Sequence, residues 1–408
     1  QSDRTTNSNT YTGLVTLAAD ATVYTAYHSW CCYGSASSPL TFDPSSGNSF
    51  TGAYALTLAG SSNITVNNPI ATSSLVVSNS TTTTLSANNT YSGSTTVSAS
   101  AGTVVLSGTN SSSSLILNGG TTRVSADAAL GAVPGSATTG VIVFNGGTLN
   151  TTATFTVNAN RGITLTGAGT IDTNASTTLT YNGILAGTGG VLNKNGSGTL
   201  ILGGNNSYTQ ATNINGGTLS ISSDQNLGNA PGSATSSQLY IGNATLLITS
   251  GFTLSANRGL SLAGSPIINT GTYTLTYGGL ITGSGNLSKQ GTGVLALSGS
   301  SSSYYGNITI AAGSIQASNS NALGSNASIS YTSSVTVDSG AWLELSGGIT
   351  IGQYKSFYLS GTGSASGGAL ISTGGSNTIQ GLINLQAASR INASSGSTLT
   401  IDVPSGNA

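Results

Sequence analysis

The chain has 408 residues, of which 4% are charged and 58 are glycine, and its formal net charge is −1. Eight scattered lysines and arginines are too few for a nucleic-acid surface, and no apolar run approaches the roughly 18 residues of a membrane-spanning helix. Because 37% of the residues are hydrophobic and recur in short bursts, the composition also excludes disorder and favours a regular β-fold.

Residues 1–60 are rich in aromatic residues and match the later repeats poorly, so we expect an N-terminal cap or assembly segment there. Cys31 and Cys32 are adjacent and are the chain's two cysteines. A strained disulfide between them, a bond to another chain and two buried thiols all stay open. The chain begins with Gln1 rather than Met, which suggests that an export signal has been removed. The aromatic residues expected at an interface are Tyr24, Tyr27, Trp30 and Tyr33.

Residues 61–403 are expected to form one repeat array with a period near 97 residues. Arg161-Gly162 returns as Arg258-Gly259, and the Ala-Leu-Gly step at 129–131 returns at 226–228 as Asn-Leu-Gly. A third copy of this step ends at Gly324. Such a super-repeat predicts that equivalent positions in successive copies occupy equivalent places in the fold.

Short apolar-alternating runs lie within each copy, for example at 103–106, 141–144 and 200–202. They predict strands of three to six residues, and the Gly, Asn and Ser between them predict tight turns. A β-sandwich array would need linkers between domains, and none is evident. We therefore expect an all-β solenoid with rungs of about 20 residues, apolar columns inside and Ser, Thr and Asn outside or in ladders.

The last predicted strand lies at 397–403, and residues 404–408 are expected to form a short tail. No polar cap follows this strand, whereas the opposite end of the chain has the distinctive segment 1–60. Two unlike ends, one of them open, favour head-to-tail assembly of identical chains.

The order of motifs in each copy resembles the autotransporter-associated β-strand repeat of bacterial surface proteins. GTLILGG at 198–204 is followed by NNSYT at 205–209, NGGTLSI at 215–221 and GFTLSANRGLSL at 251–262. The resemblance covers roughly residues 85–345. It implies a right-handed parallel β-helix, export and a surface role. The membrane barrel that ends a full autotransporter does not follow the repeats, so a released passenger or a differently used repeat is expected.

The residues that could carry catalysis are sparse. Eight aspartates and Glu344 form no D-x-D or D-D pair, and Asp127 and Asp224 are one period apart. The single histidine, His28, lies near the cysteines, but too few ligands are present for a metal site. We expect no enzyme activity, no catalytic residues, no cofactor and no metal.

Cations recur at one period as Arg161, Arg258 and Lys355. They could form a stripe that contacts a partner, but we favour the alternative that a cation closes a turn in every copy. Tyrosines also recur in register, and both an exposed interface and packing over the rung ends stay open. The in-register pairs are Tyr181 with Tyr277 and Tyr208 with Tyr304, and Lys194 pairs similarly with Lys289.

The leading functional prediction is a non-enzymatic subunit of an extracellular filament or sheath that assembles head-to-tail with itself. The alternative is a monomeric autotransporter-type adhesin that binds other cells or surfaces, and a carbohydrate-active β-helix enzyme has less support. An ice-binding solenoid has little support, because no regular T-x-T recurs at rung spacing. N-glycans are permitted by sequons such as those at Asn63 and Asn174.

Overall fold

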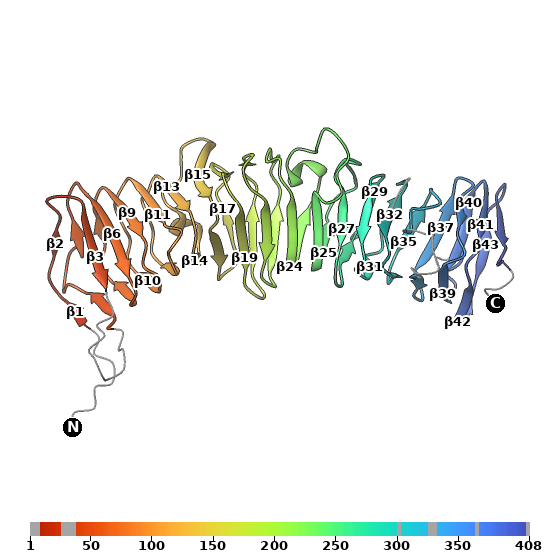
Figure 1. Cartoon of the computed structure of the whole chain (residues 1–408), viewed down its shortest axis with the longest axis horizontal. Helices are drawn as coiled ribbons and strands as arrows, with labels where there is room; N and C mark the ends of the chain where they lie inside the picture. Colours follow the sequence, from red (N-terminus) through yellow and green to blue (C-terminus); the bar gives the residue numbers. More distant parts are fainter. Residues whose placement is uncertain (1–8, 26–37, 300–302, 325–332, 364–366, 405–408) are drawn as a thin grey trace, which may run out of the picture. The chain divides into compact units, whose positions relative to one another are not determined.

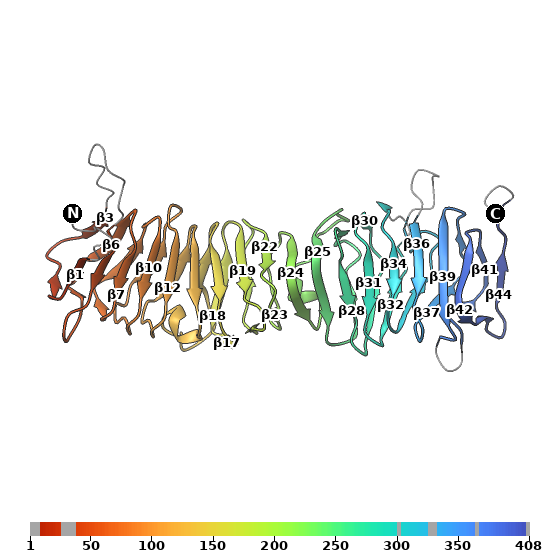
Figure 2. The same ribbon diagram turned by 90° about the horizontal axis from the view of Figure 1, so that it is seen from below.

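The computed structural model describes residues 9–25, 38–299, 303–324, 333–363 and 367–404. It divides the chain into two compact units, an N-terminal unit of residues 1–210 and a C-terminal unit of residues 211–408. Each unit is a parallel β-solenoid whose stacked coils are about 22 residues apart, slightly longer than the rung expected from the sequence (Figures 1 and 2). Within the described residues, the helical structure consists of two 3-10 turns, η1 (Asp127–Leu130) and η2 (Asp224–Leu227).

The N-terminal unit has one long sheet, a second sheet and a short third sheet, and the strands in each pair in parallel. The long sheet contains β1 (Asn9–Tyr11), β4 (Leu40–Phe42), β7 (Ile64–Val66), β10 (Thr82–Leu85), β12 (Thr103–Leu106), β14 (Thr121–Val124), β16 (Thr148–Thr151), β17 (Phe155–Val157), β19 (Gly169–Thr173), β20 (Thr178–Tyr181), β22 (Leu192–Asn195) and β23 (Thr199–Leu202). The second contains β3 (Ala21–Thr25), β6 (Ala55–Gly60), β9 (Ser74–Val77), β11 (Ser94–Val97), β13 (Ser114–Leu117), β15 (Thr138–Phe144), β18 (Arg161–Leu165) and β21 (Leu185–Ala186). The third contains β2 (Val15–Thr16), β5 (Phe50–Thr51) and β8 (Ile70–Ala71).

The C-terminal unit repeats this plan with a long, a second and a third sheet of its own. Its long sheet contains β24 (Thr212–Ile221), β25 (Leu239–Ile248), β27 (Leu260–Leu262), β28 (Ile267–Asn269), β30 (Ile281–Gly283), β31 (Leu287–Gln290), β33 (Ser303–Tyr304), β34 (Ile308–Ile310), β36 (Ser333–Val337), β39 (Lys355–Gly361) and β42 (Ile383–Ser389). The second contains β26 (Phe252–Leu254), β29 (Thr274–Tyr277), β32 (Val294–Leu297), β35 (Ser314–Ala317), β37 (Trp342–Ser346), β40 (Leu370–Gly374) and β43 (Ile391–Ala393). The third contains β38 (Thr350–Ile351), β41 (Ser376–Ile379) and β44 (Thr398–Ile401).

The core is built by alternation along each strand. In β12 and β13 every second residue is buried, and the parallel register places Leu115 beside Ile142 and Leu117 beside Phe144 in the adjacent coils. Successive side chains of a strand point to opposite faces, so the buried ones stack into apolar columns. The expected solenoid with inward apolar columns is confirmed, and so is the last strand, which appears as β44.

Polar side chains also stack inside the N-terminal unit. Asn89 accepts a hydrogen bond from Ile70 N at 3.0 Å through Oδ1 and donates one to Asn110 Oδ1 at 2.8 Å through Nδ2. Asn110 then donates to Ala129 O at 2.7 Å. A buried amide stays satisfied when each coil supplies the partner of the next, which makes this asparagine ladder compatible with the core.

The described parts of residues 1–60 form strands β1 to β6, which pair in parallel with the following coils. Their proposed role as a cap or assembly segment remains a prediction. Cys31, Cys32, Tyr27, Trp30 and Tyr33 lie outside the described residues, as does His28. Tyr24, on β3, is 69% exposed.

Candidate functional site

The most highly connected polar cluster of the C-terminal unit joins η2 to the residue that returns beside it 34 positions later. Ser223 and Asn226 form a capping box at the start of the turn, and Gly228 follows it with φ of +75°. Positive φ is costly for residues with a Cβ, which explains why glycine ends this step in each copy. The turn presents Asp224 and its last carbonyls towards one side chain, that of Arg258.

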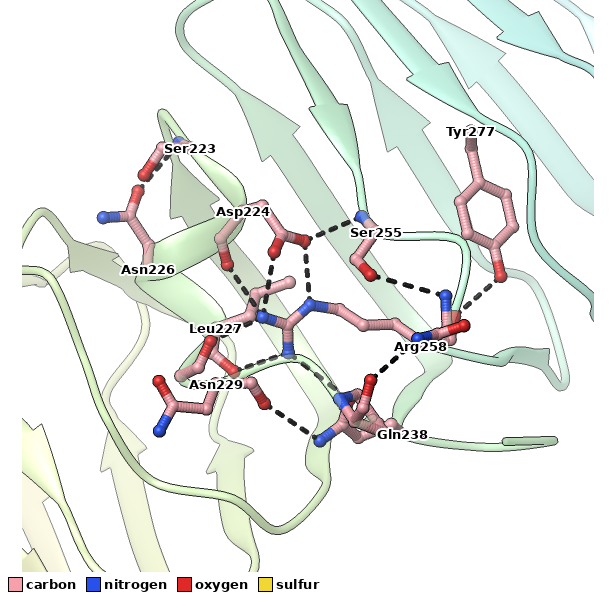
Figure 3. Close-up of polar contacts among 12 residues, drawn as sticks. Ser223, Asp224, Asn226, Leu227, Asn229, Gln238, Ser255, Arg258 and Tyr277 are labelled. Atoms are coloured by element: carbon pink, nitrogen blue, oxygen red, sulfur yellow. Dashed lines mark hydrogen bonds and ion pairs between the residues drawn. The ribbon is translucent and has the colours of Figure 1, made fainter. Parts of the chain in front are cut away.

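Arg258 is 2% exposed and its guanidinium is fully bonded by this turn (Figure 3). Nε donates to Asp224 Oδ1 at 2.8 Å, and Nη2 donates to Asp224 Oδ2 at 3.1 Å. Nη2 and Nη1 also donate to the carbonyls of Gly228, at 2.5 Å, and Leu227, at 2.9 Å. A two-toothed ion pair plus carbonyl bonds compensates the desolvation of a buried guanidinium.

The same cluster occurs one period earlier, in the N-terminal unit. Arg161 Nε donates to Asp127 Oδ1 at 2.9 Å, and Nη2 donates to Gly131 O at 2.8 Å. Nη1 donates to Ala132 O at 2.9 Å. In both copies the aspartate also accepts from a backbone amide, Asn158 N in this one, so each carboxylate ties three chain segments together. We call these two clusters the Arg–Asp clamps.

The third copy of the motif replaces the ion pair with neutral contacts. Lys355 Nζ donates to Leu323 O at 2.6 Å and to Ser333 Oγ at 2.7 Å. Ser320 stands three residues before Leu323, as each aspartate stands three residues before its leucine, and its Oγ accepts from Thr350 N at 3.0 Å. The hydroxyl therefore keeps the backbone contact of the aspartate while the negative charge is lost. Arginine with aspartate and lysine with serine are thus alternative pairings at one place.

Buried tyrosines support the clamps from the other side. Tyr277 Oη lies 2.7 Å from Arg258 O and 2.9 Å from Leu280 O, and Tyr181 Oη lies 2.8 Å from Arg161 O. Burial raises the pKa of both phenols well above its usual value, although a hydrogen bond from a backbone amide opposes the shift. The in-register Tyr208 is also buried. These tyrosines are therefore internal contacts, not exposed interface residues.

The remaining two lysines are buried among backbone carbonyls. Lys289 Nζ donates to Gly291 O and Gly293 O, both at 2.9 Å, and to Ala312 O at 3.1 Å. Lys194 Nζ donates to Asn195 O at 2.7 Å. Burial lowers the pKa of each lysine to about 8, and nearby Asp172 partly opposes this at Lys194. Burial also lowers the pKa of Lys355 to about 8.

These groups close turns and offer little for chemistry. The three periodic cations are at most 2% exposed, so the structure does not place them in a surface stripe. The clamp carboxylates are held by arginine and backbone donors, and each lysine amine is held by carbonyls or a hydroxyl. Over the residues that the structure describes, no group of three or more His, Cys, Asp or Glu side chains could hold a metal ion. In the same residues, no helix is long and apolar enough to cross a membrane.

The sequence contained one signal for the clamps that reasoning from charge alone missed. Asp127 precedes Arg161 by 34 residues, and Asp224 precedes Arg258 by the same distance. An acid and a base that recur with a constant separation in a repeat are expected to meet in every copy. The conserved separation therefore carried the pairing, although neither residue lies near its partner in sequence.

The fold and the clamps define a β-solenoid repeat protein, and comparison with known proteins specifies the kind of repeat. The Passenger-associated-transport-repeat family matches residues 75–99, 192–221 and 287–317. The chain is also similar to the Adhesin BmaC autotransporter of Brucella suis biovar 1 (strain 1330), with 54% identity over 54 residues. This match covers 13% of the chain and 2% of the adhesin. No solved structure matches the chain significantly. The chain therefore carries repeats of the autotransporter-passenger type, as the sequence motifs predicted.

Proposed function

We propose that the chain is a non-enzymatic, adhesin-like segment of an extracellular passenger, which binds other cells or surfaces. The observation that carries this proposal is the passenger repeat itself, matched three times along a parallel solenoid. The likeness to an autotransporter adhesin supports the same role and a cell-surface or secreted location. These comparisons favour the adhesin-like alternative over the filament subunit that the sequence analysis placed first.

Adhesion is tested with polystyrene beads that carry the 408-residue chain, incubated with epithelial cells and with abiotic surfaces. We expect more beads to attach than beads coated with a bovine serum albumin control. Soluble chain should reduce attachment by competition. Equal attachment of both bead types on every surface would contradict an adhesive role.

A second proposal is head-to-tail self-association, as expected from the sequence. It is supported by exposed apolar side chains on neighbouring strands of the C-terminal unit, since Leu385 on β42 is 58% exposed and Ile401 on β44 is 50% exposed. Apolar side chains on open strands favour pairing with another chain. Light scattering of the purified chain should show a mass that rises with concentration and that L385S lowers. A constant monomer mass would contradict this proposal.

A further inference from the structure

A column of threonines runs along the outer face of the long sheet in the N-terminal unit. The parallel register places them directly beside one another on five successive coils, about 4.8 Å apart. Their separations in sequence are 21, 18, 27 and 22 residues, so no regular spacing reveals them. All five are partly exposed, and in the part of the chain that the structure describes their hydroxyls have no hydrogen-bond partner. The column consists of Thr82, Thr103, Thr121, Thr148 and Thr170.

A second outward column lies two residues further along the same strands and contains Arg123. Its neighbours in the adjacent coils are Val105 and Asn150, and Asp172 follows one coil further on. The Arg123 side chain is exposed, and among the described residues it has no hydrogen-bond or ion-pair partner. It therefore differs from Arg161 and the other buried cations, whose charges are bonded internally.

An open hollow of about 270 Å³ lies beside this arginine. Hydroxyl groups of Ser107, Ser125 and Thr152 line it together with Arg123 and the apolar side chain of Val105. Small-ligand sites begin at roughly 300 Å³, so the hollow has room for about one sugar-sized group. A charged fork, hydroxyls and a small apolar area are suited to an acidic sugar.

The scaffold around the hollow recurs one period later, but the arginine does not. Thr152 Oγ1 donates to Val124 O at 3.2 Å, and Thr249 Oγ1 donates to Ile221 O at 3.1 Å in the same way. The position equivalent to Arg123 is Ser220. Because the repeat folds without a cation at this position, the charge of Arg123 is not needed to build the coil.

We propose that this face binds a polysaccharide that carries sparse carboxylates, and this proposal rests on the adhesin-like function above. The guanidinium of Arg123 pairs with a sugar carboxylate at the hollow, while the threonine column presents hydroxyls to the neighbouring sugars. A periodic glycan suits a periodic row of hydroxyls. Asp172, two coils away, repels a second carboxylate there, which favours polymers in which acidic and neutral sugars alternate.

Hyaluronan, with one carboxylate in every two sugars, is the test polymer, and carboxyl-reduced hyaluronan and dextran are the neutral controls. Binding of the 408-residue chain is measured by biolayer interferometry. We expect binding to hyaluronan alone. R123S should weaken it at least tenfold, which is about the effect of one charge-assisted two-bond contact. T121V/T148V should weaken it by roughly threefold, the smaller effect expected for neutral hydroxyls.

The matched control is R390S, which removes the other described arginine that is exposed, on the C-terminal unit. It should leave binding unchanged, and circular dichroism should show that all variants are folded. Equal losses in R123S and R390S, equal binding of the reduced polymer, or no binding to hyaluronan would overturn the proposal. The bead assay separates the two proposals, since beads that attach equally well with R123S retain the adhesin role and reject this site. Beads that fail to attach while hyaluronan binding depends on Arg123 reject the adhesin role alone.

Discussion

Arg258 Nε and Asp224 Oδ1 are 2.8 Å apart although 34 residues separate them in sequence. The contact recurs between Arg161 and Asp127 at 2.9 Å, one period earlier. In each clamp a 3-10 turn leaves the coil, and a buried arginine from a later coil bonds both its carboxylate and its carbonyls. The clamps therefore attach the longest excursions of the repeat to the solenoid, and Figure 1 shows both turns at the margin of their coils.

Replacing Asp224 with alanine should destabilise the C-terminal unit by about 3 kcal/mol, because it leaves a buried guanidinium without its counter-ion. The measurement is urea unfolding, with hydrogen–deuterium exchange of η2 to locate the effect. D224A/R258M should cost less than D224A alone, since no unpaired charge is buried.

The matched control is Gln225→Ala, which alters an exposed side chain in the same turn. It should change the unfolding midpoint little and leave exchange of η2 unchanged. If D224A behaves like this control, the ion pair does not hold the turn.

The third copy predicts a non-additive pair of substitutions. K355R alone should be destabilising, because a larger guanidinium enters a site without a carboxylate, whereas S320D alone places an acid beside a lysine that already has partners. K355R/S320D should recover at least about 1 kcal/mol relative to the sum of the two single changes, as coupled charges do. Thermal unfolding of the four proteins gives the coupling energy. A coupling near zero would show that the three copies are not interchangeable at this place.

Strands were predictable from sequence because alternation is local. The run at 103–106 is β12, and burial alternates within it. The 3-10 turns were not predictable, since four residues such as 127–130 contain too short a pattern to distinguish from a loop. The expected 97-residue repeat located Arg161 and Arg258, but burial depends on coils that return some 20 to 30 residues later.

Variable coil length hid the remaining surface features. Thr121 and Thr148 are adjacent in space because η1 fills the extra residues between them, so counting along the chain misplaces the column. Arg123 likewise showed no periodicity, and its exposure emerged only from the register of β14. Functional positions that depart from a repeat are the ones that repeat-based reasoning finds last.

Tyr277→Phe should destabilise the C-terminal unit by about 1 to 2 kcal/mol. The hydroxyl lies within hydrogen-bond distance of Arg258 O and Leu280 O, and its removal leaves buried carbonyls with fewer donors. Urea unfolding followed by circular dichroism measures the change. Tyr273→Phe is the control in the same unit, because Tyr273 is 42% exposed, and it should have almost no effect. Equal effects of the two substitutions would assign no stability to the buried hydroxyl.

The chain's three lysines should resist amine-reactive reagents in the native state. Lys194, Lys289 and Lys355 are all fully buried, and their amines are bonded. Acetylation with an N-hydroxysuccinimide ester at pH 7.5, read by peptide mass spectrometry, should modify less than about a tenth of each lysine, because modification requires local opening. The same reaction in urea should modify all three. Rapid labelling of any of them in the folded protein would show that its coil opens easily.

Stability should rise as the pH increases from about 8 towards 10. The folded-state pKa of each lysine is lowered to about 8, against an ordinary value of 10.5. Between these values the unfolded chain binds more protons than the folded chain, so the free energy of unfolding increases with pH. A lowered pKa contributes stability that is complete above 10.5 and is lost as the pH falls through 8. The gain is on the order of 1 to 3 kcal/mol for each lysine.

Above pH 10 buried tyrosines reverse this trend. Burial raises the pKa of Tyr91 to about 12 from 10, so between these values the folded chain keeps a proton that the unfolded chain loses. Stability should therefore pass through a maximum near pH 10, which urea unfolding at constant ionic strength can locate. Lys289→Met should reduce the rise below the maximum, and Tyr91→Phe should reduce the fall above it. A profile that declines steadily from pH 8 would mean that the bonds to carbonyls, rather than burial, control the lysine charges.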